Sequence, residues 1–247
     1  MAAGGGLLGT GWQDTLSIGI SGVALLAAVS ANFVASMTKR NDDRRAARAR
    51  VNDLCVRIAE LSTTIQVYRV EQDVAVGLNV YNTKVNSLIR QVVALATLAR
   101  DILSQSDIEA SAIEYALLAD AIALSGDPGA GALWEKAVAS ALTAHDRVDL
   151  LQRHADYLFT IGDAAAGERS YTEARRAMGA GASYFQLGRN QQMLAISNAN
   201  VGRGDLAHAQ FDEARRLYEA MPESPSRTYA LNTLAEARRR SLGEIAA

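Results

Sequence analysis

Residues 155–174, ADYLFTIGDAAAGERSYTEA, decide the fold of this chain. The stretch opens and closes with a small residue, has a glycine at position 162, and places Tyr171 between Gly167 and Ala174. A glycine lets the backbone turn, and small residues let two helices cross closely. The stretch therefore predicts two short helices joined at residue 162, with the aromatic side chain filling the space against a neighbouring pair.

The same pattern recurs on both sides. Residues 195–214, AISNANVGRGDLAHAQFDEA, have the equivalent small, glycine and aromatic residues at Ala195, Gly202, Ala207, Phe211 and Ala214. Upstream, the equivalent residues are Ala119, Gly126, Ala132 and Ala139, with Lys136 where an aromatic residue is expected and one residue inserted around Pro128-Gly129. Each copy predicts one helical hairpin, and stacked hairpins bury a continuous core.

A last helix is expected over Thr228–Leu242, with Ala235 in the small position and no second helix after it. A polar helix of this kind closes the end of a helical array. Only three prolines occur in 247 residues, and the composition is rich in alanine, leucine and arginine, which favour helix. The sequence therefore predicts an all-α protein with about three hairpins and a capping helix.

The arrangement resembles the tetratricopeptide repeat, whose pattern is a small residue, a turn glycine, a small residue, an aromatic residue and a small residue. The resemblance covers about residues 111–243, and the expected repeat domain is 111–247. It implies an α-solenoid that binds a peptide or protein in a concave face lined by the first helix of each unit. The residues expected on that face are Asp120, Gln152, Asp156, Arg189, Gln192, Asn200, Asn232 and Arg239.

The expected concave face is acidic in its N-terminal half and basic in its C-terminal half. It would suit a partner with the complementary charge asymmetry, whose orientation and association rate would be set by electrostatics. The alternative is that these side chains are ordinary solvated residues of surface helices.

A second feature lies at the N-terminus, where residues 15–37, TLSIGISGVALLAAVSANFVASM, contain no charge. Such a run is long enough to cross a hydrocarbon core of roughly 30 Å as one helix, so it predicts a transmembrane helix after a short tail at 1–14. A cleaved signal peptide is the alternative, but residues 1–14 contain no lysine or arginine.

Six basic residues follow this run in the juxtamembrane segment 38–50, namely Lys39, Arg40, Arg44, Arg45, Arg48 and Arg50. By the positive-inside rule they predict a single-pass protein of the plasma (inner) membrane, with the N-terminus outside and the remaining domain cytoplasmic. The cluster would set the topology and could also attract anionic lipid. Small residues recurring four apart in 15–37 leave two interpretations open, a plain anchor or a helix that associates with another.

Residues 51–106 predict amphipathic helices. One apolar ladder comprises Leu54, Ile58, Leu61, Ile65 and Tyr68, and a second comprises Val74, Leu78, Tyr81, Val85, Leu88, Val92, Leu95, Ala99 and Ile102. The two ladders are out of phase, so we expect a helix break near residues 69–74. Heptad spacing is typical of a coiled coil that joins two chains, but the width of the apolar face favours helices folded onto the downstream domain.

Catalytic and cofactor motifs are missing from the sequence. His145, His154 and His208 lack the spacing of paired metal ligands on a helix, and no glycine cluster continues into a phosphate loop. Cys55 is the only cysteine, which excludes an intrachain disulfide and suggests a buried thiol. The net charge of −2 and the pI near 6.0 give no footprint for nucleic acid.

These features together predict a protein that is not an enzyme and binds no cofactor or metal. The expected function is a membrane-anchored scaffold or adaptor that uses the tetratricopeptide-like array to bind a protein or peptide. The alternative is a structural homo-oligomer, assembled through the transmembrane helix and the 51–102 ladder.

Overall fold

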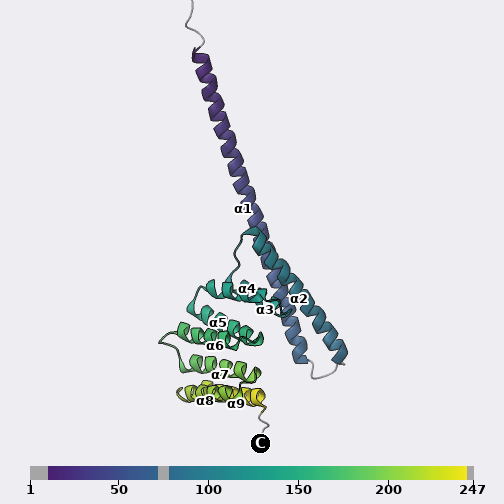
Figure 1. Cartoon of the computed structure of the whole chain (residues 1–247), viewed down its shortest axis with the longest axis vertical. Helices are drawn as coiled ribbons and strands as arrows, with labels where there is room; N and C mark the ends of the chain where they lie inside the picture. Colours follow the sequence, from purple (N-terminus) through teal and green to yellow (C-terminus); the bar gives the residue numbers. More distant parts are fainter. Residues whose placement is uncertain (1–10, 72–77, 244–247) are drawn as a thin grey trace, which may run out of the picture.

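The computed structural model describes the backbone of residues 11–71 and 78–243 and the side chains of residues 36–68 and 82–243. Within these ranges every regular element is an α-helix, which confirms the predicted all-α class. Two long helices come first, α1 (Gly11–Glu71) and α2 (Leu78–Ser106) (Figure 1). The shorter ones that follow are α3 (Ala112–Ala123), α4 (Gly129–Ala139), α5 (Ala144–Thr160), α6 (Ala164–Met178), α7 (Tyr184–Asn200), α8 (Gly204–Glu219) and α9 (Pro225–Leu242).

The shorter helices form a row of hairpins, α3 with α4, α5 with α6 and α7 with α8, and α9 packs on α7 and α8 (Figure 1). A glycine at positive φ stands at each hairpin turn: Gly126 at 73°, Gly162 at 89° and Gly202 at 78°. Residues with a Cβ rarely adopt this conformation, so the glycines direct the chain from one helix into the next. The turns lie where the sequence pattern placed them.

The small residues lie at close helix crossings. A Cβ added to Gly167 would come within 2.5 Å of the Phe159 ring and 3.2 Å of the Ala155 carbonyl oxygen. The aromatic residues between the small pairs, Tyr171 and Phe211, are fully buried. The second hairpin therefore closes at a position without a side chain, and a buried ring fills the adjacent space in the second and third hairpins.

The first hairpin has a different register from the predicted one. Its buried small residues are Ala130 and Ala137, with the fully buried Trp134 between them. The predicted residues Ala132, Lys136 and Ala139 are exposed. The turn is thus one residue shorter than in the second hairpin, rather than one longer, and a tryptophan takes the aromatic position.

The last helix shows the same kind of register error. Ala230 and Leu234 of α9 are buried against α7 and α8, whereas the predicted Ala235 is exposed. The helix also begins at Pro225, three residues before the expected start, because the Ser224 side chain caps it by accepting from the Arg227 amide.

The apolar ladders of α1 and α2 face each other within one chain. The buried residues are Val51, Leu54, Cys55, Ile58, Leu61, Ile65, Val85, Val92, Ala96, Ala99 and Leu103. The pair also packs on α3, in agreement with helices folded onto the downstream domain. The helix α1 ends at Glu71, inside the predicted break, and the side chains of Val74, Leu78 and Tyr81 lie outside the described residues.

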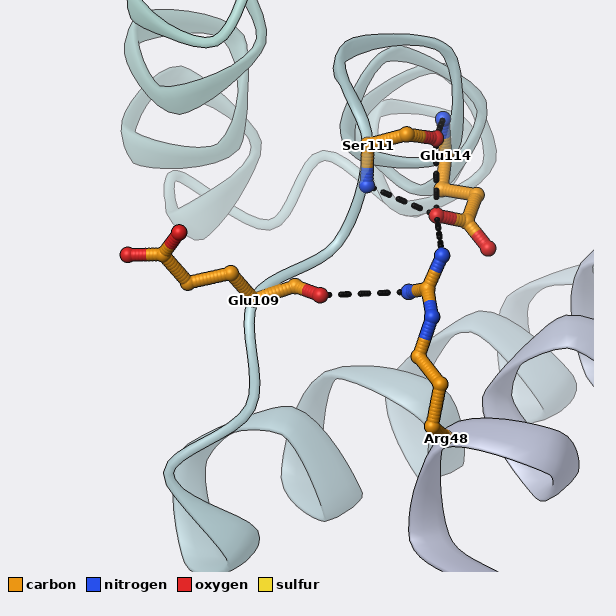
Figure 2. A network of polar contacts seen from close by, with 4 residues as sticks. All are labelled: Arg48, Glu109, Ser111 and Glu114. Atoms are coloured by element: carbon orange, nitrogen blue, oxygen red, sulfur yellow. Dashed lines mark hydrogen bonds and ion pairs between the residues drawn. The ribbon is translucent and has the colours of Figure 1, made fainter. Parts of the chain in front are cut away.

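Two arginines, Arg44 and Arg48, hold α1 to the start of the array, and Figure 2 shows the contacts of Arg48. Arg48 donates to the Glu114 carboxylate at 2.6 Å and to the Glu109 carbonyl oxygen at 3.2 Å, and Arg44 pairs with Asp107 at 2.7 Å. Glu114 also accepts from the backbone and hydroxyl of Ser111, which completes a capping box on α3. Two residues of the basic segment therefore contact the start of the array.

The ionisation of Glu114 reflects these contacts. Burial acts to raise the pKa of Glu114, but the hydrogen bonds from Ser111 and then from Arg48 outweigh it, and the net effect lowers the pKa below 4.5. The carboxylate is thus held in its charged form at a part-buried junction between α1 and α3.

The prediction of a single-pass membrane protein is corrected by the structure. Among the described residues, no helix combines the length and the apolar character that a membrane span requires. This finding overturns the transmembrane helix at 15–37 and the inner-membrane location. Serine, glycine and asparagine dilute the apolar run, and it is part of α1, which continues through the charged segment 38–50 to Glu71.

Gly167→Ala should destabilise the protein by about 1–3 kcal/mol, because the new methyl group overlaps the Phe159 ring. Gly131→Ala is the matched control: its Cβ would lie 3.8 Å from Tyr157, and alanine favours a helix over glycine by about 0.5–1 kcal/mol. Urea unfolding of the full chain measures both free energies. Equal stability of the wild type and Gly167→Ala would contradict the close crossing.

Arg48→Met should lower the free energy of unfolding by about 1–2 kcal/mol, less than for a fully buried pair because the Arg48 side chain is 41% exposed. Arg45→Met is the control, since its guanidinium is 84% exposed and lies 3.8 Å from Asp42. The stabilisation from Glu114 is present above pH 4.5 and is lost as the pH falls through the lower folded pKa. The difference in the free energy of unfolding between wild type and Arg48→Met should therefore become smaller in acid. A difference that does not change with pH would contradict a stabilising ion pair between Arg48 and the Glu114 carboxylate.

Candidate functional site

The first helices of the hairpins, α3, α5 and α7, lie side by side, and two adjacent cavities open to the solvent between them. One, of about 510 Å³, lies between α5 and α7 and has the apolar lining residues Phe159, Met193, Ile196 and Val201. The other, of about 340 Å³, lies between α3 and α5, where Asp120, Arg153 and Tyr157 contribute to the lining. Asp156 and Thr160 line both cavities, and we call this continuous surface the groove.

Asp156 is held at the centre of the groove by two hydroxyl groups. The Tyr171 hydroxyl of α6 donates to Asp156 Oδ1 at 2.5 Å, and the Ser197 hydroxyl of α7 donates to the same oxygen at 2.9 Å. Burial, followed by the neighbouring carboxylate, raises the pKa of Tyr171 well above its usual range, so this phenol remains a donor. One carboxylate therefore connects α5, α6 and α7.

The surroundings of Asp156 disfavour the ionised form of its carboxyl group. Burial raises the pKa of Asp156 above 3.8, and the hydrogen bonds from Tyr171 and Ser197 oppose this without cancelling it. A partly buried carboxylate without a cationic partner lowers stability.

A charged pair crosses from α5 to α3 at the other side of Asp156. Arg153 donates to the Asp120 carboxylate, and its guanidinium carbon lies 5.2 Å from the centre of the Trp134 ring. Asp120 was expected to make this end of the concave face acidic. The pair with Arg153 neutralises it, so the acidic part of the groove is reduced to Asp156.

The structure brings together three of the eight predicted site residues, Asp120, Asp156 and Asn200, near the C-terminal ends of α3, α5 and α7. Gln152 is instead buried and donates to Asn190 at 2.9 Å; with the exposed Arg189 it lines a separate cavity of about 180 Å³.

The remaining predicted residues lie outside the groove. Gln192 accepts from the Tyr218 hydroxyl at 3.0 Å, which ties α7 to α8. Asn232 and Arg239 are exposed on α9, where Arg239 pairs with Glu236 at 2.6 Å. The predicted basic half is thus partly neutralised, as the acidic half is by Arg153.

Sequence reasoning missed several groove residues. Thr160 lies one helical turn after Asp156, and Met193, Ser197 and Asn200 share one face of α7, so helical spacing from the predicted residues could have found them. Tyr171 was read only as a space-filling ring, although a buried tyrosine hydroxyl usually finds a polar partner.

The histidines and the cysteine have structural surroundings. His154 stacks between Trp134 and Tyr157, with ring centres 6.2 and 6.4 Å away, and burial lowers its pKa. Burial, and then the charge of Glu114, raises the pKa of Cys55 to about 11. Within the described side chains, no group of three or more His, Cys, Asp or Glu residues is placed to hold a metal ion.

Comparisons with known proteins found no matching family model, no matching curated protein and no matching solved structure.

Asp156→Asn should raise the free energy of unfolding at neutral pH, because Asn Oδ1 still accepts from both hydroxyls while the desolvated charge is removed. The folded pKa of Asp156 is raised, so its unfavourable effect appears as the pH rises through that pKa and is absent below 3.8. Glu173→Gln, which removes an exposed carboxylate from α6, is the matched control and should leave the stability almost unchanged. Denaturant unfolding at neutral and acidic pH measures both. A loss of stability in Asp156→Asn at neutral pH would contradict the claim that the partly buried charge of Asp156 destabilises the fold.

Proposed function

We propose that this chain is a non-catalytic protein-interaction scaffold that binds a peptide or a protein segment in the groove along α3, α5 and α7. The observation that carries the proposal is the pair of adjoining cavities that meet at Asp156 and Thr160. They form a continuous depression along neighbouring helices, which an extended segment could follow.

The support is both architectural and local. Stacked helical hairpins present an extended surface made from equivalent faces of successive units, and such arrays recognise partners through that surface. The α3–α9 array has the turn glycines, the small crossings and the buried rings of the tetratricopeptide pattern in its second and third hairpins. We therefore propose a tetratricopeptide-like scaffold, with recognition rather than chemistry as its role.

The N-terminal hairpin of α1 and α2 has a supporting role in this proposal. The ladder residues that the structure describes are buried or partly buried within the chain and against α3, and we propose that they stabilise the array. The alternative of a homo-oligomer built on that ladder receives no support from this packing.

Thr160→Trp tests the groove, because the exposed Thr160 lines both cavities and a large ring there would obstruct the place where they meet. Thr172→Trp is the matched control: Thr172 is exposed on α6, and its hydroxyl bonds the carbonyl four residues earlier, as that of Thr160 does. Full-chain wild type and both variants serve as bait in quantitative affinity purification from cells of the source organism. We expect proteins that wild type and Thr172→Trp retain to be lost from Thr160→Trp.

Circular dichroism and thermal unfolding of the three proteins check that the fold is unchanged. A wild-type bait that retains nothing specific would overturn the proposal. So would a folded Thr160→Trp that retains every protein bound by the control.

A further inference from the structure

We infer that the groove takes a partner segment that carries an arginine or lysine side chain next to an aliphatic residue, with Asp156 as the counter-charge. The inference rests on the proposed function, since it names the chemistry of the partner for the same groove. Charge, hydrogen bonding and the apolar wall of the larger cavity each contribute to it.

The charges around the groove leave one carboxylate without a cation. Asp156 is the one charged residue that lines the 510 Å³ cavity, and in the described part of the chain it forms no ion pair. Arg153, the cation nearest along α5, is engaged by the Asp120 carboxylate and lies over the Trp134 ring. The groove at Asp156 is therefore complementary to a positive group supplied from outside.

The hydrogen bonds of Asp156 point to the same conclusion. Both hydroxyl donors, from Tyr171 and Ser197, reach Oδ1, and no donor within the described residues reaches Oδ2. An ionised carboxylate can accept about four hydrogen bonds. An ammonium or guanidinium group would supply the missing donor and the missing charge together, which makes the contact stronger than one between neutral groups.

The wall of the larger cavity explains why the basic residue should have an aliphatic neighbour. Phe159, Met193, Ile196 and Val201 line this cavity beside Asp156, and Val201 is 37% exposed. A methionine adapts its shape to different apolar side chains. The long stem of an arginine or lysine can also lie along such a wall while its charged end reaches a carboxylate.

The geometry also disfavours an acidic partner. An acidic side chain in this cavity would face Asp156 with no lining cation to compensate, and like charges in a partly buried site repel. The same residue that attracts a basic segment therefore rejects an acidic one.

A library of random peptides displayed on phage tests the inference with the full chain. Selections run in parallel on wild type, Asp156→Asn and Glu173→Gln, which removes an exposed carboxylate from α6 as the matched control. We expect wild type and Glu173→Gln to enrich peptides with arginine or lysine beside leucine, isoleucine, valine or methionine. Asp156→Asn should not enrich the basic residue.

A selected peptide is then synthesised with arginine and with citrulline, its neutral isostere, and binding is measured by fluorescence anisotropy. Replacing arginine by citrulline should weaken binding to wild type by about tenfold or more, as expected for a hydrogen bond between charged groups. The same replacement should have little further effect on Asp156→Asn, because the two changes remove one interaction.

The outcomes separate the two proposals. The inference is supported if basic peptides are enriched and if replacing arginine by citrulline weakens binding to wild type much more than binding to Asp156→Asn. Peptides that bind wild type and are lost in Thr160→Trp, but show no basic preference or no coupling to Asp156, overturn the inference and leave the groove as a binding surface. Failure of the wild type to enrich any peptide counts against both.

Discussion

Two helices can cross closely only where one of them has no side chain in the way, and the array depends on this constraint. At Gly167 even a methyl group would overlap the Phe159 ring, and at Gly188 it would come within 2.5 Å of the Tyr218 ring. The aromatic residues use the volume that the glycines leave free, so each missing side chain fixes the position of a large one. The separation of the two helices within a hairpin, α5 from α6 and α7 from α8, follows from these contacts.

The N-terminal hairpin solves the problem of the first repeat, whose outer face has no preceding unit to cover it. The pair α1 and α2 supplies that cover and buries Leu118 and Ile122 of α3 in the same core as Ile58 and Val92. Glu114 has two tasks at this junction, because it caps its own helix and accepts from Arg48 of the neighbouring one. A change at this carboxylate would therefore affect the start of α3 and its attachment together.

Local pattern was enough to predict the helices and the turns, since periodicity, glycine position and residue size are local properties. The hairpins at Gly162 and Gly202 follow directly from such spacing. Register in the first hairpin was not predictable in this way, because alanine occurs at 130, 132, 137 and 139 and only the burial of Trp134 decides between them. The apolar run at 15–37 illustrates a second limit: composition in one window predicted a separate element, whereas the helix continues for 61 residues.

The site was partly predictable for a related reason. Helical spacing placed Asp120, Asp156 and Asn200 on one surface, but it could not show that Arg153 neutralises Asp120. It also misplaced Gln152, whose position on α5 turns it toward Asn190 of α7. Pairing between side chains on different helices depends on tertiary geometry, and a sequence pattern contains no information about which charges are already matched.

The length of α1 has a mechanical consequence. At 1.5 Å per residue its 61 residues span about 90 Å, and the part before Arg44, which pairs with Asp107, spans about 50 Å. Figure 1 shows the N-terminal part of α1 projecting away from the array. Each residue of such a helix adds to its length and also rotates one end about the helix axis relative to the other. Removing seven residues would shorten it by about 10 Å and leave its rotation almost unchanged, whereas removing one residue would rotate one end by about 100° relative to the other. The direction in which the groove faces, relative to the first turn of α1, therefore depends on the number of residues in this helix.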